Sequence, residues 1–145
     1  RRIAAKQGGA IVINSAQYIW TGFPGDAHSA AAKTAQATMT AKLARDWAPH
    51  GIRVNAIAAG FFPHDSSVSG SDEAVSASLP NMIPAGRTGS TYEFGWLSAL
   101  TCTPLLGGLT GQVILQDGGE SLRRSLRNPD FVPPRERVQG PWGWQ

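Results

Sequence analysis

The feature that most constrains this chain is an apolar run, a long helical segment and a second apolar run that follow one another. Residues 10–14 and 52–58 are short and continuously apolar, which is typical of strands covered on both faces in parallel sheets. Between them, Asp26 is expected to cap a helix that runs to about Ala48, where Pro49-His50-Gly51 stops it. This order predicts a strand–helix–strand unit of an α/β fold with a parallel sheet.

Further elements are expected on both sides of this unit. Residues 1–7 are expected to be the end of a helix closed by Gly8-Gly9. A short helix near 72–79, a helix over 92–103 and a third strand over 112–116 are expected to follow. The chain is thus divided into an α/β part, residues 1–119, and an extension containing proline, arginine and tryptophan, residues 120–145.

Composition narrows the class of protein. The chain has 145 residues, 41% of them apolar and 16% charged, which predicts one folded domain with a core. No apolar run is long enough for a membrane span. A single cysteine, Cys102, expected to be buried, favours the reducing cytoplasm. The net charge is +3, but five arginines fall within residues 123–137. This distribution indicates a basic tail rather than a nucleic-acid-binding face.

On the expected long helix, Ser29 and Lys33 lie four residues apart, so their side chains share one face. Lys33 would sit near the carboxyl ends of the strands, where open α/β sheets bind ligands. Tyr18 lies 15 residues before Lys33, in the loop after the first strand. The residues Ala35, Met39, Leu43 and Trp47 recur every four positions. They predict an apolar stripe that packs on the sheet or contacts another copy of the chain.

These residues resemble the C-terminal half of the short-chain dehydrogenase/reductase family, in which a Tyr-x-x-x-Lys helix performs nicotinamide chemistry. Here Ser29 stands at the tyrosine position. The stretches 51–60, 83–87 and 110–119 also resemble the family, and the match covers about residues 8 to 119. The resemblance implies part of a doubly wound, Rossmann-type parallel-sheet domain whose N-terminal nucleotide-binding half lies outside this sequence. The start at Arg1 without methionine fits that expectation.

Within the family, the string His28-Ser29-Ala30-Ala31-Ala32-Lys33 resembles the 2,4-dienoyl-CoA and enoyl-CoA reductase branch. The resemblance implies that Tyr18 supplies the acid to an acyl thioester, with Ser29 in support. Lys33 would hold the nicotinamide ribose. The implied reaction is NAD(P)H-dependent reduction of a conjugated double bond, in an enzyme that forms homo-oligomers and acts on an acyl-CoA-like small molecule.

Cofactor contacts are expected at the corner after the second strand. The resemblance places the nicotinamide carboxamide beside Gly60, Phe61 and Phe62, where a family Pro-Gly pair is replaced by Ala59-Gly60. NADP is slightly preferred over NAD, and no metal is expected.

Two alternatives remain open. An alcohol or ketone dehydrogenase of the 3-oxoacyl type would use His28 or Ser29 in the tyrosine's place, although the family's usual serine falls on Ala16 here. The second alternative is that the chain is a truncated, non-catalytic fragment. The choice of proton donor between Tyr18 and His28 is likewise open.

Overall fold

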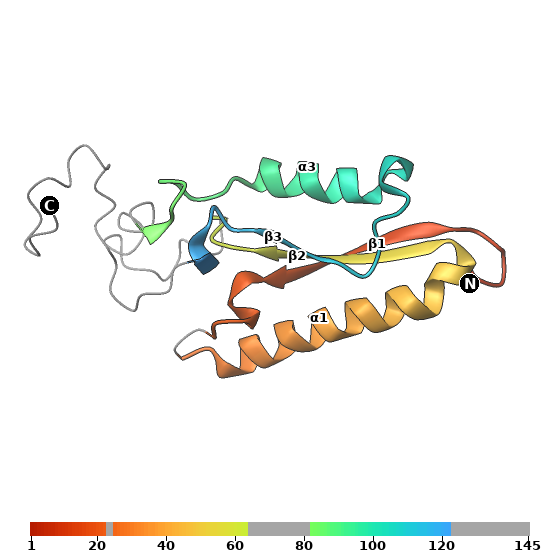
Figure 1. Ribbon diagram of the computed structural model, residues 1–145, viewed down its shortest axis with the longest axis horizontal. Helices are drawn as coiled ribbons and strands as arrows, with labels where there is room; N and C mark the ends of the chain where they lie inside the picture. The colour runs from red at the N-terminus through yellow and green to blue at the C-terminus, as the bar shows by residue number, and fades with distance from the viewer. Residues whose placement is uncertain (23–24, 64–81, 123–145) are drawn as a thin grey trace, which may run out of the picture.

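A computed structural model describes residues 1–22, 25–63 and 82–122 of the chain. Its three strands, β1 (Gly9–Ala16), β2 (Ile52–Ala59) and β3 (Val113–Gln116), form a parallel sheet in the order β1-β2-β3. The helices α1 (Ala27–Trp47) and α3 (Thr91–Cys102) lie on opposite sides of this sheet (Figure 1). This arrangement confirms the expected Rossmann-type α/β fold.

Four short 3-10 helices complete the described elements: η1 (Gln17–Ile19), η2 (Ala48–His50), η3 (Pro104–Leu106) and η4 (Glu120–Leu122). η1 directly continues β1, and η4 follows the turn after β3. Both therefore lie at the carboxyl end of the sheet, the end at which parallel α/β sheets bind ligands.

The central strand β2 forms the buried middle of the sheet. Val54, Ala56, Ile57 and Ala58 are fully buried, because β2 has a neighbour on each edge and helices on its faces. β1 pairs with β2 in parallel register from Gly9 opposite Ile52 to Ala16 opposite Ala59. The expected strands are confirmed, each with bounds that differ by one or two residues from the sequence-based range.

α1 begins and ends close to the expected residues, and only part of its expected apolar stripe packs on the sheet. Asp26 occupies the N-cap position without a side-chain capping hydrogen bond. Of the predicted apolar stripe, Leu43 and Trp47 pack against the core cluster of Ala44, Ile52 and Val54. Met39 is 45% exposed, and Ala35 is also exposed. A four-residue spacing drifts around a helix of 3.6 residues per turn, so the stripe divides between the core and the surface.

Two polar side chains of β2 fasten the segment that leads into β3. Arg53 donates to the backbone oxygens of Thr101, at 2.8 Å, and Thr103, at 2.9 Å, near the end of α3. The amide of Asn55 donates to the Leu109 oxygen at 2.9 Å, and its Oδ1 accepts from the Gln112 backbone at 3.1 Å. The two Arg53 bonds satisfy carbonyls that the end of α3 leaves without partners in the helix.

Two expectations are wrong, and two ranges lie partly or wholly outside the described residues. Residues 2–6 form turns rather than the end of a helix, and Lys6 has φ 52°. Cys102 is exposed rather than buried. The short helix expected near 72–79 lies outside the described residues, as does the extension beyond residue 122, so the expected division at residue 119 stays a prediction. Within the described part of the chain, no helix has the length and apolar character of a membrane span.

Candidate active site

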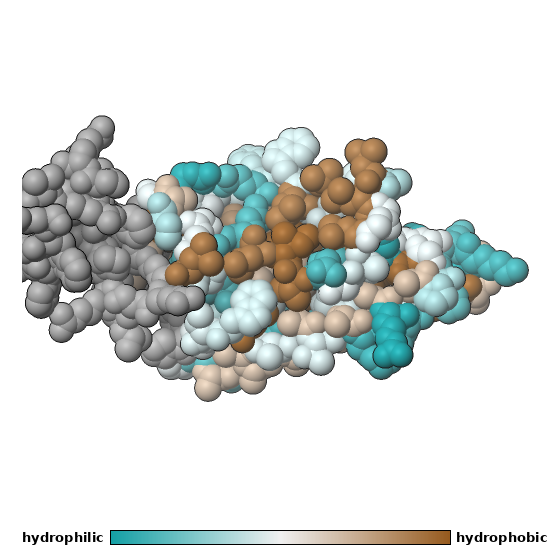
Figure 2. All heavy atoms as spheres, in the orientation of Figure 1, coloured by the Kyte–Doolittle hydropathy of each residue, from teal (hydrophilic) through white to brown (hydrophobic). Residues whose placement is uncertain are grey.

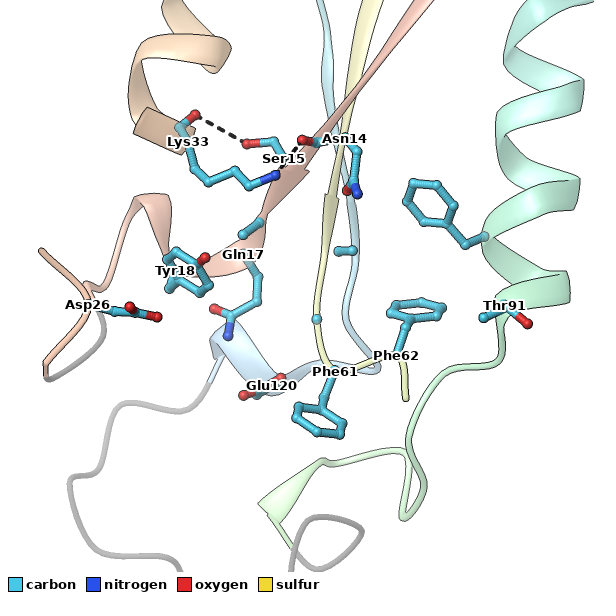
Figure 3. Close-up of a pocket in the computed structure, with 14 residues that line it drawn as sticks. Asn14, Ser15, Gln17, Tyr18, Asp26, Lys33, Phe61, Phe62, Thr91 and Glu120 are labelled. Atoms are coloured by element: carbon cyan, nitrogen blue, oxygen red, sulfur yellow. Dashed lines mark hydrogen bonds between the residues drawn. The ribbon is translucent and has the colours of Figure 1, made fainter. Parts of the chain in front are cut away.

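A cleft of about 510 Å³ opens at the carboxyl ends of β1 and β2 (Figure 3). The residues that line it come from β1 and η1, from the start of α1, from the end of β2, from α3 and from η4: Asn14, Ser15, Ala16, Gln17, Tyr18, Asp26, Lys33, Ala59, Gly60, Phe61, Phe62, Thr91, Phe94 and Glu120. The structure therefore brings Tyr18 and Lys33 together with Gly60, Phe61 and Phe62, as the sequence predicted.

Lys33 is bound to β1 through both its side chain and its backbone. Its Nζ donates to the Asn14 oxygen at 2.7 Å. The Ser15 hydroxyl donates to the Lys33 backbone oxygen at 3.2 Å, and Figure 3 shows both bonds. Consecutive residues of one strand thus fix the lysine's place on the helix.

Tyr18 lies on the same side of the cleft as Lys33 (Figure 3). Its hydroxyl is 2.9 Å from the Ser29 Oγ, and either oxygen can donate. Ser29 does not itself line the cleft, so it reaches the site through Tyr18. The two residues that the sequence places 11 positions apart therefore form one hydroxyl pair.

His28 lies elsewhere. Its side chain is 85% exposed, and its Nε2 is 3.8 Å from Asp26. His28 is not among the residues that line the cleft. His28 lies in the first turn of α1, one residue before Ser29, and consecutive residues of a helix lie on different faces.

Gly60 is required by packing inside the protein. A Cβ at this position would lie 2.7 Å from the Asp117 Cα and 2.8 Å from its Cβ. The Gly60 amide donates to the Gln116 oxygen at 2.9 Å. The close approach that glycine permits is therefore an approach of β2 to the turn after β3.

The cleft also contains functional candidates that sequence reasoning missed. No sequence pattern singles out Ser15, Gln17, Thr91, Phe94 or Glu120, which line the cleft. Glu120 follows directly after β3, so the rule that ligands bind beyond strand carboxyl ends could have found it. Phe94 had no such signal, because its position depends on how α3 packs. No cluster of three or more potential metal ligands occurs among the described residues.

Residues 1–121 match the family model described as enoyl-(acyl carrier protein) reductase. The chain belongs to the short-chain dehydrogenase/reductase family. Since this match covers most of the sequence, the resemblance expected from the Ser29–Lys33 helix and the later stretches is confirmed.

Relatives within this family carry different names. A Bacillus subtilis (strain 168) protein named "Probable 2,4-dienoyl-CoA reductase" is 35% identical over 123 residues, covering 83% of this chain and 48% of that protein. The 3-oxoacyl-acyl-carrier-protein reductase FabG of Aquifex aeolicus (strain VF5) is 32% identical over 119 residues, covering 82% and 48%. The chain thus spans about half the length of these relatives.

A solved structure supports the same family assignment. The gluconate 5-dehydrogenase of Burkholderia cenocepacia J2315, in complex with NADP and tartrate, superposes with a TM-score of 0.74 at 29% identity, covering 83% of this chain and 48% of that one.

Proposed function

We propose that the native gene product carrying this sequence is an NAD(P)H-dependent oxidoreductase that reduces a conjugated double bond of an acyl-CoA thioester. The observation that supports this proposal is the pair formed by the Tyr18 hydroxyl and the Ser29 Oγ, 2.9 Å apart, in a cleft that also contains Lys33. Ser29 stands where the family's helix tyrosine is expected, and Tyr18 supplies a phenol from the preceding loop. The Bacillus subtilis relative is named for this reaction.

In this proposal each residue has a separate task. Tyr18 donates its proton toward the thioester carbonyl oxygen, where negative charge develops. Ser29 orients that hydroxyl through their hydrogen bond. Lys33 offers ammonium donors to the ribose hydroxyls while β1 holds it in place. The reduced nicotinamide supplies the hydride.

The residues present fit the nicotinamide and ribose end of such a cofactor. Lys33 supplies donors on one side of the cleft, and Gly60, Phe61 and Phe62 line the other. The described residues contain no Gly-x-Gly-x-x-Gly turn between a strand and a helix, the pattern that would hold the pyrophosphate. NADP is proposed ahead of NAD because the Burkholderia cenocepacia structure contains NADP.

A second candidate is reduction of a 3-oxoacyl thioester, which the Aquifex aeolicus relative favours by its name. Carbonyl reduction in this family calls for a serine hydroxyl at the position of Ala16, which has none. The exposed His28 does not replace the tyrosine from its position on the surface. A non-catalytic role is the third candidate, since the chain spans about half the length of its relatives.

The test is a direct comparison of substrates on the native gene product. NADPH or NADH oxidation is followed at constant enzyme with 2,4-hexadienoyl-CoA and with acetoacetyl-CoA. We expect faster turnover of the dienoyl thioester, with NADPH preferred. Faster reduction of acetoacetyl-CoA would favour the second candidate. Absence of turnover together with absence of cofactor binding by titration calorimetry would overturn the oxidoreductase proposal.

The proposed enzyme acts as a homo-oligomer, and the exposed side of α1 is one candidate contact. Figure 2 shows further apolar atoms gathered between the two helices. Met39→Glu places a charge on the exposed side and is expected to yield a folded, smaller species in sedimentation. Leu43→Glu is expected to unfold the chain, because Leu43 packs against the core cluster. An unchanged sedimentation coefficient for Met39→Glu would exclude this contact. The cytoplasm stays the predicted location.

A further inference from the structure

One side of the cleft is formed by aromatic rings that the proposed chemistry does not use. Phe62 and Phe94, here called the aromatic wall, both line the cleft. Their ring centroids are 6.0 Å apart and their planes are inclined by 72°. This is an edge-to-face pair, a favourable arrangement for two aromatic rings. In Figure 3 the Phe62 ring lies across the cleft from Tyr18.

Gly89 fixes the Phe62 ring from behind. A Cβ on Gly89 would lie 2.3, 2.4 and 2.6 Å from three Phe62 ring atoms, distances at which atoms overlap. The Gly89 amide also donates to the Phe61 oxygen at 3.0 Å. The ring therefore occupies space that only a glycine leaves open, and the backbone beside it is hydrogen-bonded.

The start of α3 fixes the other ring. Ser90 and Glu93 form a capping box, in which the Ser90 Oγ accepts from the Glu93 amide and the Glu93 carboxylate accepts from the Ser90 amide. Arg87 binds the same carboxylate through two nitrogens, at 2.7 and 2.9 Å. Phe94 follows Glu93 directly. The Phe94 ring therefore projects from the first turn of α3, which the Ser90 hydroxyl, the Glu93 carboxylate and Arg87 hold in place.

We propose that the aromatic wall is a specificity surface that selects a flat, conjugated or aromatic acyl group, whose carbonyl oxygen faces Tyr18. This inference rests on the proposed function and names the part of the substrate that the cleft distinguishes. A planar π-system gains ring contacts against Phe62 and Phe94 that a saturated chain of the same length does not. Because both rings are held before the substrate arrives, little side-chain freedom is lost on binding.

The experiment measures binding rather than turnover. The native gene product is titrated with the N-acetylcysteamine thioesters of 2,4-hexadienoic and hexanoic acids, which have the same number of carbons. The wild type is expected to bind the dienoyl compound about 3- to 10-fold more tightly, the range expected for aromatic contacts. Phe94→Leu, which keeps an apolar side chain, is expected to bring the ratio close to one. Phe94→Tyr keeps the ring and is expected to preserve it.

Trp96→Leu is the matched control, because Trp96 is an aromatic residue of the same helix that is 72% exposed and does not line the cleft. Its ratio should equal the wild-type ratio. Tighter binding of the dienoyl thioester without reductase activity would overturn the proposed function but support the proposed role of the aromatic wall. If the enzyme is an active reductase but wild type and Phe94→Leu have the same ratio of affinities for the dienoyl and hexanoyl thioesters, only the proposed role of the aromatic wall would be overturned. Equal losses in Phe94→Leu and Trp96→Leu would also count against it.

Discussion

The two sides of the cleft are built in different ways. The polar side, with Tyr18 and Lys33, comes from η1 and α1, and hydrogen bonds to Ser29 and to β1 hold these two residues in place. The aromatic wall comes from the end of β2 and the start of α3, and ring packing against Gly89 holds it. Removing one polar group deletes a chemical function, whereas altering a packed ring changes how well a substrate fits. We therefore expect substitutions on the polar side to cause large losses of activity, and substitutions in the aromatic wall to cause small changes in substrate preference.

The largest effect is expected for Lys33→Met. The methionine keeps much of the side-chain length but removes the ammonium that donates to Asn14 and, in the proposed function, to the ribose. Turnover of the native gene product should fall below detection, and cofactor affinity measured by titration should fall with it. Lys42→Met is the control, since Lys42 lies on the same helix and pairs with Asp46 at the surface. Activity retained in Lys33→Met would remove Lys33 from the site.

The second-largest loss of activity is expected for Tyr18→Phe. The ring stays, but the hydroxyl that pairs with Ser29 is lost. We expect kcat for the dienoyl thioester to fall on the order of 10²- to 10⁴-fold, the range for a lost general acid. Tyr92→Phe is the control because Tyr92, the other tyrosine of the chain, is exposed on α3.

A second variant separates the two candidate donors. His28→Ala should leave kcat unchanged, since His28 does not line the cleft. Full activity in Tyr18→Phe combined with loss of activity in His28→Ala would reverse the assignment of the proton donor.

The difference between the two sides also explains what could be predicted from the sequence. Tyr18, Ser29 and Lys33 belong to one continuous unit, so fixed spacings and helical periodicity place them relative to one another. Phe94 lies 32 positions after Phe62, and its place in the cleft depends on packing against the Phe62 ring, which itself packs against Gly89. The periodicity within one helix or strand does not predict such a contact between distant elements. The four-residue spacing on α1 left a similar choice open, because a spacing alone does not tell which residues of a drifting stripe pack on the sheet and which lie at the surface.

A smaller effect on the polar side is expected for Ser15→Ala. Ser15 is 2% exposed, and its hydroxyl donates to the Lys33 backbone oxygen. Loss of this bond should let Lys33 shift, raising the cofactor KM by about 2- to 10-fold, the range for one net hydrogen bond, with a smaller change in kcat. Ser98→Ala is the control, since the Ser98 Oγ is buried without a hydrogen-bond partner among the described residues. A fall in kcat at unchanged KM would argue against a positioning role.

The smallest effect is expected on the aromatic side, at the ion pair that holds the start of α3. The hydrogen bond from Arg87, followed by that from the Ser90 backbone, lowers the pKa of Glu93 from 4.5 to about 2. A carboxylate whose pKa is lowered on folding stabilises the fold above its unfolded pKa, and this stabilisation is lost as the pH falls toward the folded pKa. The melting temperature should therefore lose a Glu93-dependent contribution between pH 4.5 and about 2.

Glu93→Gln tests this contribution, because glutamine keeps the size of the side chain and does not titrate. Its melting temperature at pH 6 should be slightly below that of the wild type, and the difference should shrink as the pH approaches 2. The difference is small because the pair is exposed to solvent, where water and salt screen it. Asp46→Asn is the control, since it removes the surface pair with Lys42 on α1 and leaves the capping box intact. If Glu93→Gln, but not Asp46→Asn, also lowers the preference for the dienoyl over the hexanoyl thioester, the start of α3 holds Phe94 in place for substrate selection. An unchanged preference would mean that packing of Phe62 on Gly89 is sufficient to keep the aromatic wall in position.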